Sequence, residues 1–275
     1  MKLKDRIAIV TGAGRGIGKA IALSLAQEGA HLVVCSRTRA EIEETAAKIR
    51  ALDRRALAIK ADISDREDVD NLVRSAIQEF GTIDILVNNA GIQGPIGPLV
   101  ENDMDRWIQT IHINLIAVFL CSRAVLPIMM ERRQGKIINL SGGGATSARP
   151  YFSAYAAAKA AVVRLTETLA QEVKEYNIQV NAIAPGTVNT RMLEEVLAAE
   201  KATGDNTLAG LNQQLQTAEG APEKAAALAV FLASDESDGL SGRLLSAVWD
   251  NWQAVPRYIE EIMSSDIFTL RRVVR

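Results

Sequence analysis

Short runs of β-branched and apolar residues alternate with longer stretches of helical periodicity along most of the chain. The runs that predict strands are 7–11, 32–35, 57–60, 85–87, 136–141 and 178–184, and the stretches that predict helices are 16–28, 40–51, 65–80, 103–130 and 154–175. Strands joined by helices of this length need right-handed crossovers, which place the strands parallel in one sheet with helices on both faces. We therefore predict an α/β fold, a single doubly wound domain.

The domain organisation is expected to be simple. No break in composition marks a boundary before about residue 250, so residues 1–250 are expected to form one domain. Residues 187–221, rich in Ala, Glu, Gln, Thr and Gly, follow a strand end and are predicted to form a mobile lid. Residues 251–275 are predicted to form a charged tail whose amphipathic helix begins near Pro256. The apolar face of this tail either packs on its own subunit or covers a site of a neighbouring subunit.

Charge and composition exclude several classes of protein. The 275 residues carry 31 Lys and Arg against 33 Asp and Glu, so the chain lacks the basic surface of a dedicated nucleic-acid binder. The apolar stretch 113–130 contains Arg123 and Pro127 and is too polar for a simple membrane span. Cys35 and Cys121 are expected to be reduced core residues, and no His or Cys spacing predicts a metal site. A charged start without a signal-peptide core predicts a soluble cytoplasmic protein.

A glycine-rich turn directly follows the first predicted strand. Residues 11–18 are Thr-Gly-Ala-Gly-Arg-Gly-Ile-Gly, and they open the first predicted helix. Glycines at Gly12, Gly16 and Gly18 let the backbone approach a pyrophosphate, and the N–H groups at the helix start supply an anion-binding field. Because strand, turn and helix come in the order that this binding mode needs, we predict a dinucleotide site. A glycine loop without a ligand is the alternative.

The end of the second predicted strand indicates which dinucleotide binds. A carboxylate about 20 residues after the turn would hold a ribose 2′-hydroxyl, but this chain has Ser36 followed by Arg37. A hydroxyl and a guanidinium would bind a 2′-phosphate, and Arg15 inside the turn could approach the same group. We therefore predict NADP(H) in preference to NAD(H). The alternative is that both arginines are solvated surface residues.

A phenol and an ammonium are predicted to share one helix face, at Tyr155 and at Lys159 four residues later. A phenol with an ordinary pKa of about 10 is a poor acid or base at neutral pH, and a nearby ammonium lowers that pKa. Such a pair on its own is weak evidence, because it often arises by chance on helix surfaces. Placed after the fifth strand of a chain with a dinucleotide turn, it predicts proton transfer.

Taken together, these motifs resemble those of the classical short-chain dehydrogenase/reductase family, and the match spans about residues 3–247. The matching motifs are Thr11-Gly12-x-x-x-Gly16-x-Gly18, Asp62-Ile63, Asn88-Asn89-Ala90-Gly91, Asn114, Tyr155-x-x-x-Lys159 and Pro185-Gly186 followed by Thr190. The resemblance implies a Rossmann fold with a parallel seven-stranded sheet, whose last strand lies within 239–245, and a dinucleotide-binding catalytic domain at 1–250. It also implies hydride transfer between nicotinamide and a small-molecule carbonyl or alcohol, and a homo-oligomer, either a tetramer or a dimer.

The resemblance further implies roles for individual residues. Tyr155 is expected to exchange the proton with the substrate oxygen, Lys159 to lower the pKa of Tyr155 and hold the nicotinamide ribose, and Asn114 to anchor a relay water. The expected cofactor-binding residues are Gly12, Arg15, Gly16, Ile17, Gly18, Ser36, Arg37, Asp62, Ile63, Asn89, Ala90, Gly91, Tyr155, Lys159, Pro185, Gly186, Val188 and Thr190. Residues 62–63 are expected to flank the adenine, and residues 185–190 to hold the nicotinamide amide.

The chain departs from the family at the catalytic serine. In the family, the serine that orients the substrate carbonyl lies thirteen residues before the tyrosine and three after an asparagine at the end of the fifth strand. In this chain both counts lead to Gly142, and Ser141 lies just before it. Either Ser141 orients the substrate carbonyl by another backbone path, or a glycine-loop N–H or a later hydroxyl does so, or the protein is a cofactor-binding sensor or scaffold with little turnover. The later hydroxyls are those of Thr146, Ser147 and Ser153. Losing one such donor typically costs about 10²–10³ in rate, which weakens catalysis without abolishing it.

The sequence leaves the substrate open. Small ketones, sugars, steroids and 3-oxoacyl thioesters are all compatible with a fold that hosts many chemistries. The acidic residues within 187–221 disfavour a highly anionic substrate. Dehydratase or epimerase chemistry on a sugar nucleotide is disfavoured too. Relatives with that chemistry usually carry a larger C-terminal substrate domain, whereas only about 25 residues follow the last predicted strand here.

Overall fold

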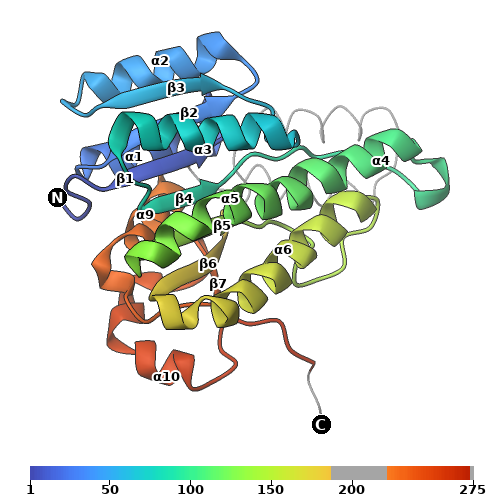
Figure 1. Cartoon of the computed structure of the whole chain (residues 1–275). Coiled ribbons are helices and arrows are strands. Elements are labelled where there is room, and N and C mark those ends of the chain that lie inside the picture. The colour runs from blue at the N-terminus through green and yellow to red at the C-terminus, as the bar shows by residue number, and fades with distance from the viewer. Residues whose placement is uncertain (187–221, 273–275) are drawn as a thin grey trace.

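The computed structural model describes residues 1–186 and 222–272, and within them seven parallel strands form one sheet. The strands are β1 (Ile7–Thr11), β2 (His31–Ser36), β3 (Ala56–Lys60), β4 (Ile85–Asn88), β5 (Gly135–Leu140), β6 (Ile178–Ala184) and β7 (Leu244–Ser246). Their order across the sheet is β3-β2-β1-β4-β5-β6-β7, so the winding reverses between β1 and β4 (Figure 1). The predicted doubly wound α/β fold is confirmed, and the first six strands each begin and end within one residue of the prediction.

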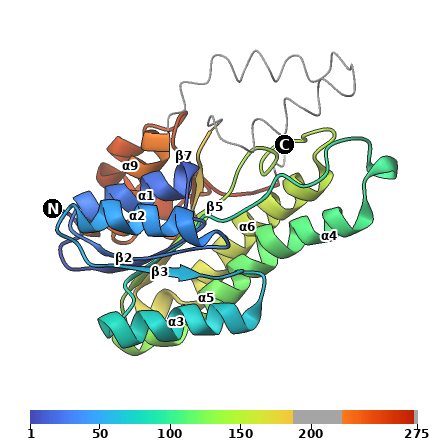
Figure 2. The same ribbon diagram turned by 90° about the horizontal axis from the view of Figure 1, so that it is seen from above.

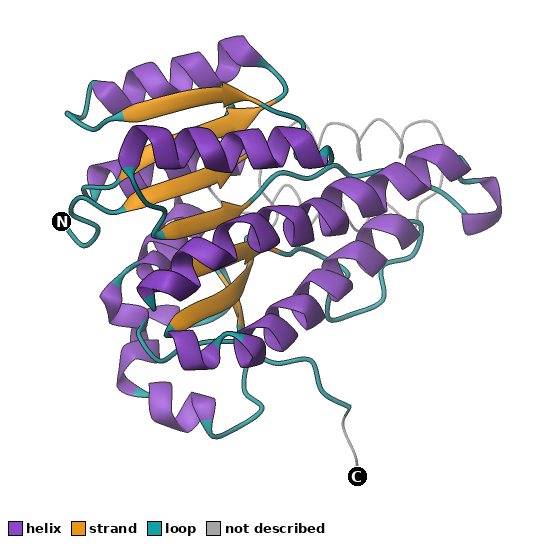
Figure 3. Cartoon of the chain, viewed as in Figure 1, coloured by secondary structure: helices purple, strands orange, loops and turns teal. Residues whose placement is uncertain are grey.

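Helices cover both faces of the sheet (Figures 2 and 3). One face carries α1 (Gly16–Gln27), α2 (Arg39–Arg50) and α9 (Pro222–Ala233), and the other carries α3 (Arg66–Phe80), α5 (Ala117–Arg132) and α6 (Ser153–Glu172). Short 3₁₀ turns are η1 (Leu99–Glu101), η3 (Lys174–Tyr176) and η4 (Asp235–Ser237). Strands β1, β4 and β5 are buried along their whole length, because each lies between two helix layers.

The long predicted helix 103–130 is interrupted in the structure. Helix α4 (Met104–Ile111) runs into a single π-helical turn, η2 (His112–Ile116), before α5 continues. The π turn carries Asn114, whose side chain bonds both backbone groups of Ile92, and a tertiary contact of this kind can stabilise the wider turn. The helical stretch Met104–Arg132 contains an 18-residue window with a mean hydropathy of 2.0 and is long and apolar enough for a membrane span by length and composition, but its buried side packs on α3 and the sheet.

The predicted tail helix forms two short helices, η5 (Trp252–Arg257) and α10 (Ile259–Met263). Val255 and Ile262 are 3% and 4% exposed and belong to the same apolar cluster as α1 and α9. These contacts lie within one chain, so the described part of the tail packs on its own subunit.

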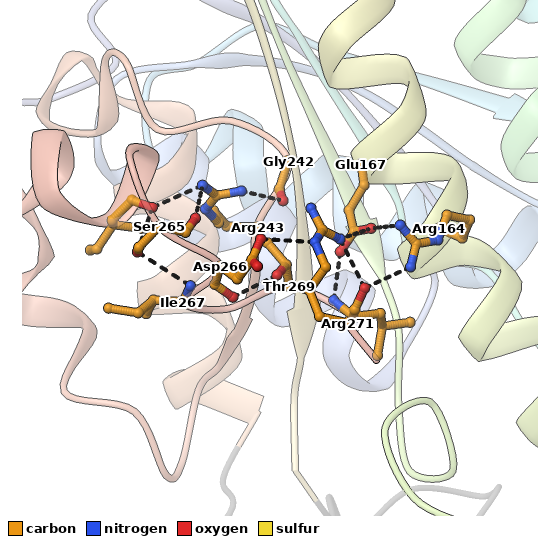
Figure 4. A network of polar contacts seen from close by, with 11 residues as sticks. Arg164, Glu167, Gly242, Arg243, Ser265, Asp266, Ile267, Thr269 and Arg271 are labelled. Carbon is orange, nitrogen blue, oxygen red and sulfur yellow. Dashed lines mark hydrogen bonds and ion pairs between the residues drawn. The ribbon is translucent and has the colours of Figure 1, made fainter. Parts of the chain in front are cut away.

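After α10 the chain runs back along β7, held by a network of polar contacts (Figure 4). The N–H of Leu244 donates to the carbonyl of Phe268 at 2.8 Å, which covers the exposed edge of β7. The buried carboxylate of Glu167 on α6 accepts from the N–H of Leu270 at 2.7 Å. Arg243 donates to two carbonyls of the tail. The tail therefore belongs to the sheet layer through its backbone as well as through apolar packing.

Candidate active site and cofactor pocket

A cavity of about 600 Å³ opens at the carboxyl ends of β1 to β6, at the point where the winding of the sheet reverses. Its lining includes most of the residues predicted to bind cofactor, namely Gly12, Arg15, Gly16, Ile17, Gly18, Ser36, Arg37, Asp62, Ile63, Asn89, Ala90, Gly91, Tyr155, Lys159 and Pro185. Gly186 follows β6 at a φ of +81°. The predicted Val188 and Thr190, and the predicted lid 187–221, lie outside the described residues.

The glycine turn packs directly on the loop that follows β4. Gly12 has a φ of +65°, and an added Cβ there would lie 2.9 Å from Ala90 Cα, while one at Gly18 would overlap Asn89 Nδ2. Asn89 Nδ2 also donates to the carbonyl of Thr11 at 2.9 Å. Because a side chain at either glycine would push the two loops apart, glycine keeps the start of α1 close to the cavity floor. This cradle fits the pyrophosphate of a dinucleotide.

The end of β2 forms the outer wall of the cavity. The hydroxyl of Ser36 accepts from the N–H of Thr38 at 3.2 Å, and the neighbouring Arg37 is exposed. Arg15 pairs with Glu41 on the first turn of α2, with 3.0 Å between Nη1 and Oε1. Glu41 lines the cavity although no sequence motif marks it, and only its place at the start of the helix that follows β2 hints at this position. A bound phosphate would compete with this carboxylate for Arg15.

Asp62 and Ile63 follow β3 at the same wall. Asp62 accepts hydrogen bonds from the N–H and the hydroxyl of Ser64, at 3.0 and 2.6 Å. Partial burial opposes ionisation of this carboxyl, but the bonds from Ser64 and the charge of Arg37 outweigh it and lower the pKa of Asp62. An anionic oxygen beside the apolar Ile63 is suited to accept from an amino group on a flat aromatic base.

Tyr155 and Lys159 lie on adjacent turns of α6, both line the cavity, and they are 8% and 4% exposed. Lys159 Nζ donates to the carbonyl of Leu140 at 2.7 Å and lies 5.6 Å from the ring centroid of Tyr155. Burial lowers the pKa of Lys159 to about 8. Burial also raises the pKa of Tyr155, and the charge of Arg149 partly offsets this rise. In this geometry the ammonium of Lys159 bonds the carbonyl of Leu140 on β5 rather than the phenol, and the lowering of the Tyr155 pKa by Lys159 stays a prediction.

Asn114 is fully buried in the π turn. Its Oδ1 accepts from the N–H of Ile92 and its Nδ2 donates to the carbonyl of the same residue, both at 2.8 Å. An added Cβ at Gly91 would lie 2.8 Å from Asn114 Oδ1 and 3.6 Å from Lys159 Nζ. The structure therefore brings Asn114 close to Lys159, and its amide fixes the loop that lies over the lysine.

The loop after β5 brings Gly142 rather than a serine to Tyr155. An added Cβ at Gly142 would lie 2.6 Å from Tyr155 Oη, so the phenol oxygen occupies space that a side chain at position 142 would take. The neighbouring Ser141 lines the cavity and is 2% exposed, and its hydroxyl donates to the carbonyl of Lys159 at 3.1 Å. In this structure the Ser141 proton is directed at the backbone of α6.

The other candidate hydroxyls lie further from the cavity. Ser153 Oγ accepts from Trp107 Nε1 at 3.0 Å, which ties it to α4. Thr146 and Ser147 are exposed, and none of these three side chains is part of the cavity wall as far as the described residues form it. The backbone N–H groups of the glycine loop remain as predicted donors.

Two further residues at the site are not predicted from the sequence. Gln93 is 3% exposed and lines the cavity, and its Nε2 has no hydrogen-bond partner within residues 1–186 and 222–272. Arg149 stacks on Phe152 and faces the ring of Tyr155. Both lie in loops whose paths depend on tertiary packing, so the sequence offers only a weak signal, a polar side chain some residues after a strand end.

Comparisons with known proteins cover most of the chain. The family model described as short chain dehydrogenase matches residues 6–201. The 3-oxoacyl-(acyl-carrier-protein) reductase of Thermotoga maritima is 34% identical over 245 residues, covering 89% of this chain and 97% of the relative. The protein of that name from Synechocystis sp. is 37% identical over 234 residues, covering 85% and 91%. Among solved structures, NAD⁺-bound xylitol dehydrogenase has a TM-score of 0.84 at 30% identity, covering 90% of this chain and 98% of that one. Levodione reductase has a TM-score of 0.82 at 32% identity, covering 92% and 99%.

Proposed function

The chain belongs to the short-chain dehydrogenase family of oxidoreductases, and on that premise we propose that it transfers hydride between NADP(H) and a carbonyl or secondary alcohol of a small molecule. The observation that carries this proposal is the pair of Tyr155 and Lys159 on α6, at the wall of the cavity that the glycine cradle closes. A phenol and an ammonium at this place supply and return the proton that must accompany each hydride.

The chain's own residues handle the proton. In the reducing direction the bound nicotinamide supplies the hydride for the new C–H bond, and Tyr155 Oη gives its proton to the carbonyl oxygen. In the oxidising direction Tyr155 Oη takes the proton of the alcohol. Lys159, with a pKa of about 8, exchanges protons near neutral pH and is the group that restores the charge state of Tyr155. Asn114 keeps the loop after β4 against Lys159 and anchors the relay water.

The preference for NADP(H) rests on the end of β2. Ser36, Arg37 and Arg15 offer a hydroxyl and two guanidinium groups where a carboxylate would select a ribose hydroxyl. Glu41 weighs against this preference, because it pairs with Arg15. A solved relative, xylitol dehydrogenase, is bound to NAD⁺. Family membership therefore does not decide between NADP(H) and NAD(H), and the side chains at the end of β2 have to.

Cofactor binding is tested by titrating the protein with NADPH and with NADH and following the fluorescence of the nicotinamide and of the tryptophans. A preference for NADPH of tenfold or more, about 1.4 kcal/mol, supports the assignment of Arg15, Ser36 and Arg37. Equal binding, or a preference for NADH, overturns it and leaves Arg37 as a surface residue.

Turnover is tested with a panel of carbonyl compounds that includes a 3-oxoacyl thioester and levodione, which the names of the relatives suggest. Once the wild-type protein reduces one of them, Tyr155→Phe is expected to lose nearly all turnover while still binding the cofactor. Full turnover of Tyr155→Phe on that substrate would show that another group donates the proton.

A second candidate function is favoured by Gly142. A chain without the serine that orients the substrate carbonyl could bind cofactor with little turnover and act as a sensor or scaffold. Tight cofactor binding without turnover of any carbonyl in the panel would favour this function over the enzyme.

We also propose a cytoplasmic homo-oligomer, a tetramer or a dimer, with neither nucleic acid nor membrane as a partner. Met104 and Ile108 on α4 and Phe119 on α5 are 74%, 47% and 46% exposed. Contact with a second copy would cover such apolar side chains. Light scattering of the purified protein measures the mass directly, and a monomer at micromolar concentration would overturn this part of the proposal.

A further inference from the structure

Arg149 lies in the loop between β5 and α6, with its guanidinium near two aromatic rings. The guanidinium carbon is 3.8 Å from the ring centroid of Phe152 and 5.7 Å from that of Tyr155. Within the described residues Tyr155 is the only titratable group that acts on the charge of Arg149, and no carboxylate does. Burying a cation without a counter-ion costs folding free energy. The position of Arg149 beside Tyr155 is therefore more consistent with a function than with packing alone.

Gly144 of the preceding loop makes room for this arrangement. An added Cβ at Gly143 would make only an ordinary contact, 3.5 Å from Arg149 Nη1, but one at Gly144 would lie 3.3 Å from Arg149 Cβ and 2.7 Å from Ala156 Cβ. Gly144 also has a φ of +90°, which other residues rarely adopt. The stretch that lacks the family serine is thus the same stretch that admits Arg149 to the side of Tyr155.

Among the residues that the structure describes, the charged and titratable groups around Tyr155 come from two elements. Arg149 and Tyr151 belong to the loop before α6, and Lys159 lies one turn further along the helix. Ile96, from the loop after β4, is apolar. Of these groups Arg149 offsets the rise that burial causes in the pKa of Tyr155, whereas Lys159 is engaged with the Leu140 carbonyl.

We propose that Arg149 is a positioning residue for Tyr155, in place of part of what a serine at position 142 would do. Its guanidinium holds the tyrosine ring and stabilises the charge left on Tyr155 Oη when the O–H bond breaks. The proposal rests on the proposed function. In carbonyl reduction the hydride and its electron pair go from the nicotinamide to the carbonyl carbon, the Tyr155 proton goes to the carbonyl oxygen, and a phenolate remains beside Arg149.

A purely structural role for Arg149 is the competing explanation, because stacking on Phe152 alone could fix the loop. The two explanations differ in whether the positive charge of Arg149 affects the ionisation of Tyr155. Arg149→Met keeps an unbranched stem for packing but removes the charge, whereas Arg149→Lys keeps the charge but loses the planar stack. Arg149→Gln is a second neutral variant for the case in which Arg149→Met does not fold.

The experiment measures the ionisation of Tyr155 itself by ¹³C NMR of protein labelled at the tyrosine ζ carbon. The chain has four tyrosines, and the signal missing from Tyr155→Phe assigns Tyr155. We expect the pH midpoint of Tyr155 ionisation to be at least about half a pH unit higher in Arg149→Met than in the wild type. In Arg149→Lys we expect this shift to be smaller. Arg133→Met is the matched control, since Arg133 lies 5.9 Å from the ring of Tyr176, remote from the cavity lining. This control should leave Tyr155 unchanged.

An unchanged ionisation of Tyr155 in Arg149→Met overturns the proposal, and so does a shift that Arg149→Lys fails to reduce, because packing alone would then explain it. With a verified substrate, Arg149→Met should also lower kcat about tenfold at neutral pH without weakening cofactor binding, and an unchanged kcat overturns the role in the reaction. The NMR result needs no turnover. It therefore tells a failure of this proposal from a failure of the proposed function.

Discussion

Arg15 Nη1 lies 3.0 Å from Glu41 Oε1, so the arginine of the glycine turn is paired with a carboxylate on the first turn of α2. The same carboxylate crowds the turn, because an added Cβ at Gly14 would lie 2.8 Å from Glu41 Oε2 and 3.3 Å from Ser36 Oγ. Glu41 thus occupies the corner where a 2′-phosphate would meet Arg15 and Ser36. We expect cofactor choice to depend on whether that phosphate displaces Glu41 from the arginine.

Replacing Glu41 with Gln is expected to raise the preference for NADPH over NADH about tenfold, or about 1.4 kcal/mol, because it frees Arg15 and removes a charge that repels phosphate. Fluorescence titration with both cofactors measures the ratio of the two Kd values. Glu44→Gln is the matched control, since Glu44 pairs with Lys19 and Lys48 and is not part of the described cavity lining. A ratio that Glu41→Gln leaves unchanged would remove Glu41 from cofactor choice.

The buried ammonium of Lys159 makes stability depend on pH. Its pKa is about 8 in the folded protein against an ordinary value of 10.5, so between these values the unfolded chain holds a proton that the folded chain lacks. The free energy of unfolding therefore rises with pH across this window. Below it both states are protonated, and the cost of burying the charge is fully present, up to about 3 kcal/mol.

We expect Lys159→Met to be more stable than the wild type at about pH 7, and this difference to shrink as the pH rises toward 10.5, because Met carries no charge to desolvate. Denaturant unfolding of both proteins at a series of pH values measures the difference. The lost hydrogen bond to Leu140 acts at every pH and so does not produce the slope. A difference that stays constant from pH 8 to 10.5 would contradict the assignment of a readily deprotonated Lys159.

Adding the family serine at Gly142 is expected to lower turnover about tenfold or more rather than to raise it. The new Cβ would lie 2.6 Å from Tyr155 Oη, so the phenol must move, and misplacing a catalytic group by a fraction of an ångström is costly. Gly142→Ala is the control, because it adds the Cβ without the hydroxyl. Steady-state kinetics compare the three proteins on one substrate. If Gly142→Ser turned over faster than the wild type, the hydroxyl would matter more than the position of Tyr155.

Local patterns predict the strands better than they predict the helix that carries Asn114. A short apolar run between glycines has few alternatives to a buried strand, whereas the π turn is tied to a tertiary contact between Asn114 and Ile92 that periodicity does not contain. The candidate site shows the same difference between features set by local sequence and features set by tertiary contacts. The glycine turn and Tyr155 belong to local motifs, but Glu41 and Arg149 matter through neighbours from other segments, and no single-sequence pattern records those neighbours.

The anchor of the tail is expected to depend on Glu167. Its side chain is 8% exposed, and it accepts from the N–H of Leu270 at 2.7 Å and from Arg271 at 3.2 Å, and it also pairs with Arg164 (Figure 4). Glu167→Gln keeps an acceptor for the backbone but removes the charge that two half-exposed arginines compensate. We expect a loss of about 1–2 kcal/mol of stability, below the cost of breaking a fully buried pair, because both arginines still reach solvent.

The more specific expectation for Glu167→Gln is local opening of the tail. The edge of β7 is covered only while the carbonyl of Phe268 accepts from Leu244, so amide exchange of Leu244 and Leu270 should speed up about tenfold. Cofactor affinity should stay as in the wild type, because the network is no part of the described cavity lining. Glu172→Gln, at an exposed position at the end of α6, is the matched control. Exchange that speeds up equally in both variants, or in neither, would show that the carboxylate of Glu167 is not the anchor of the tail.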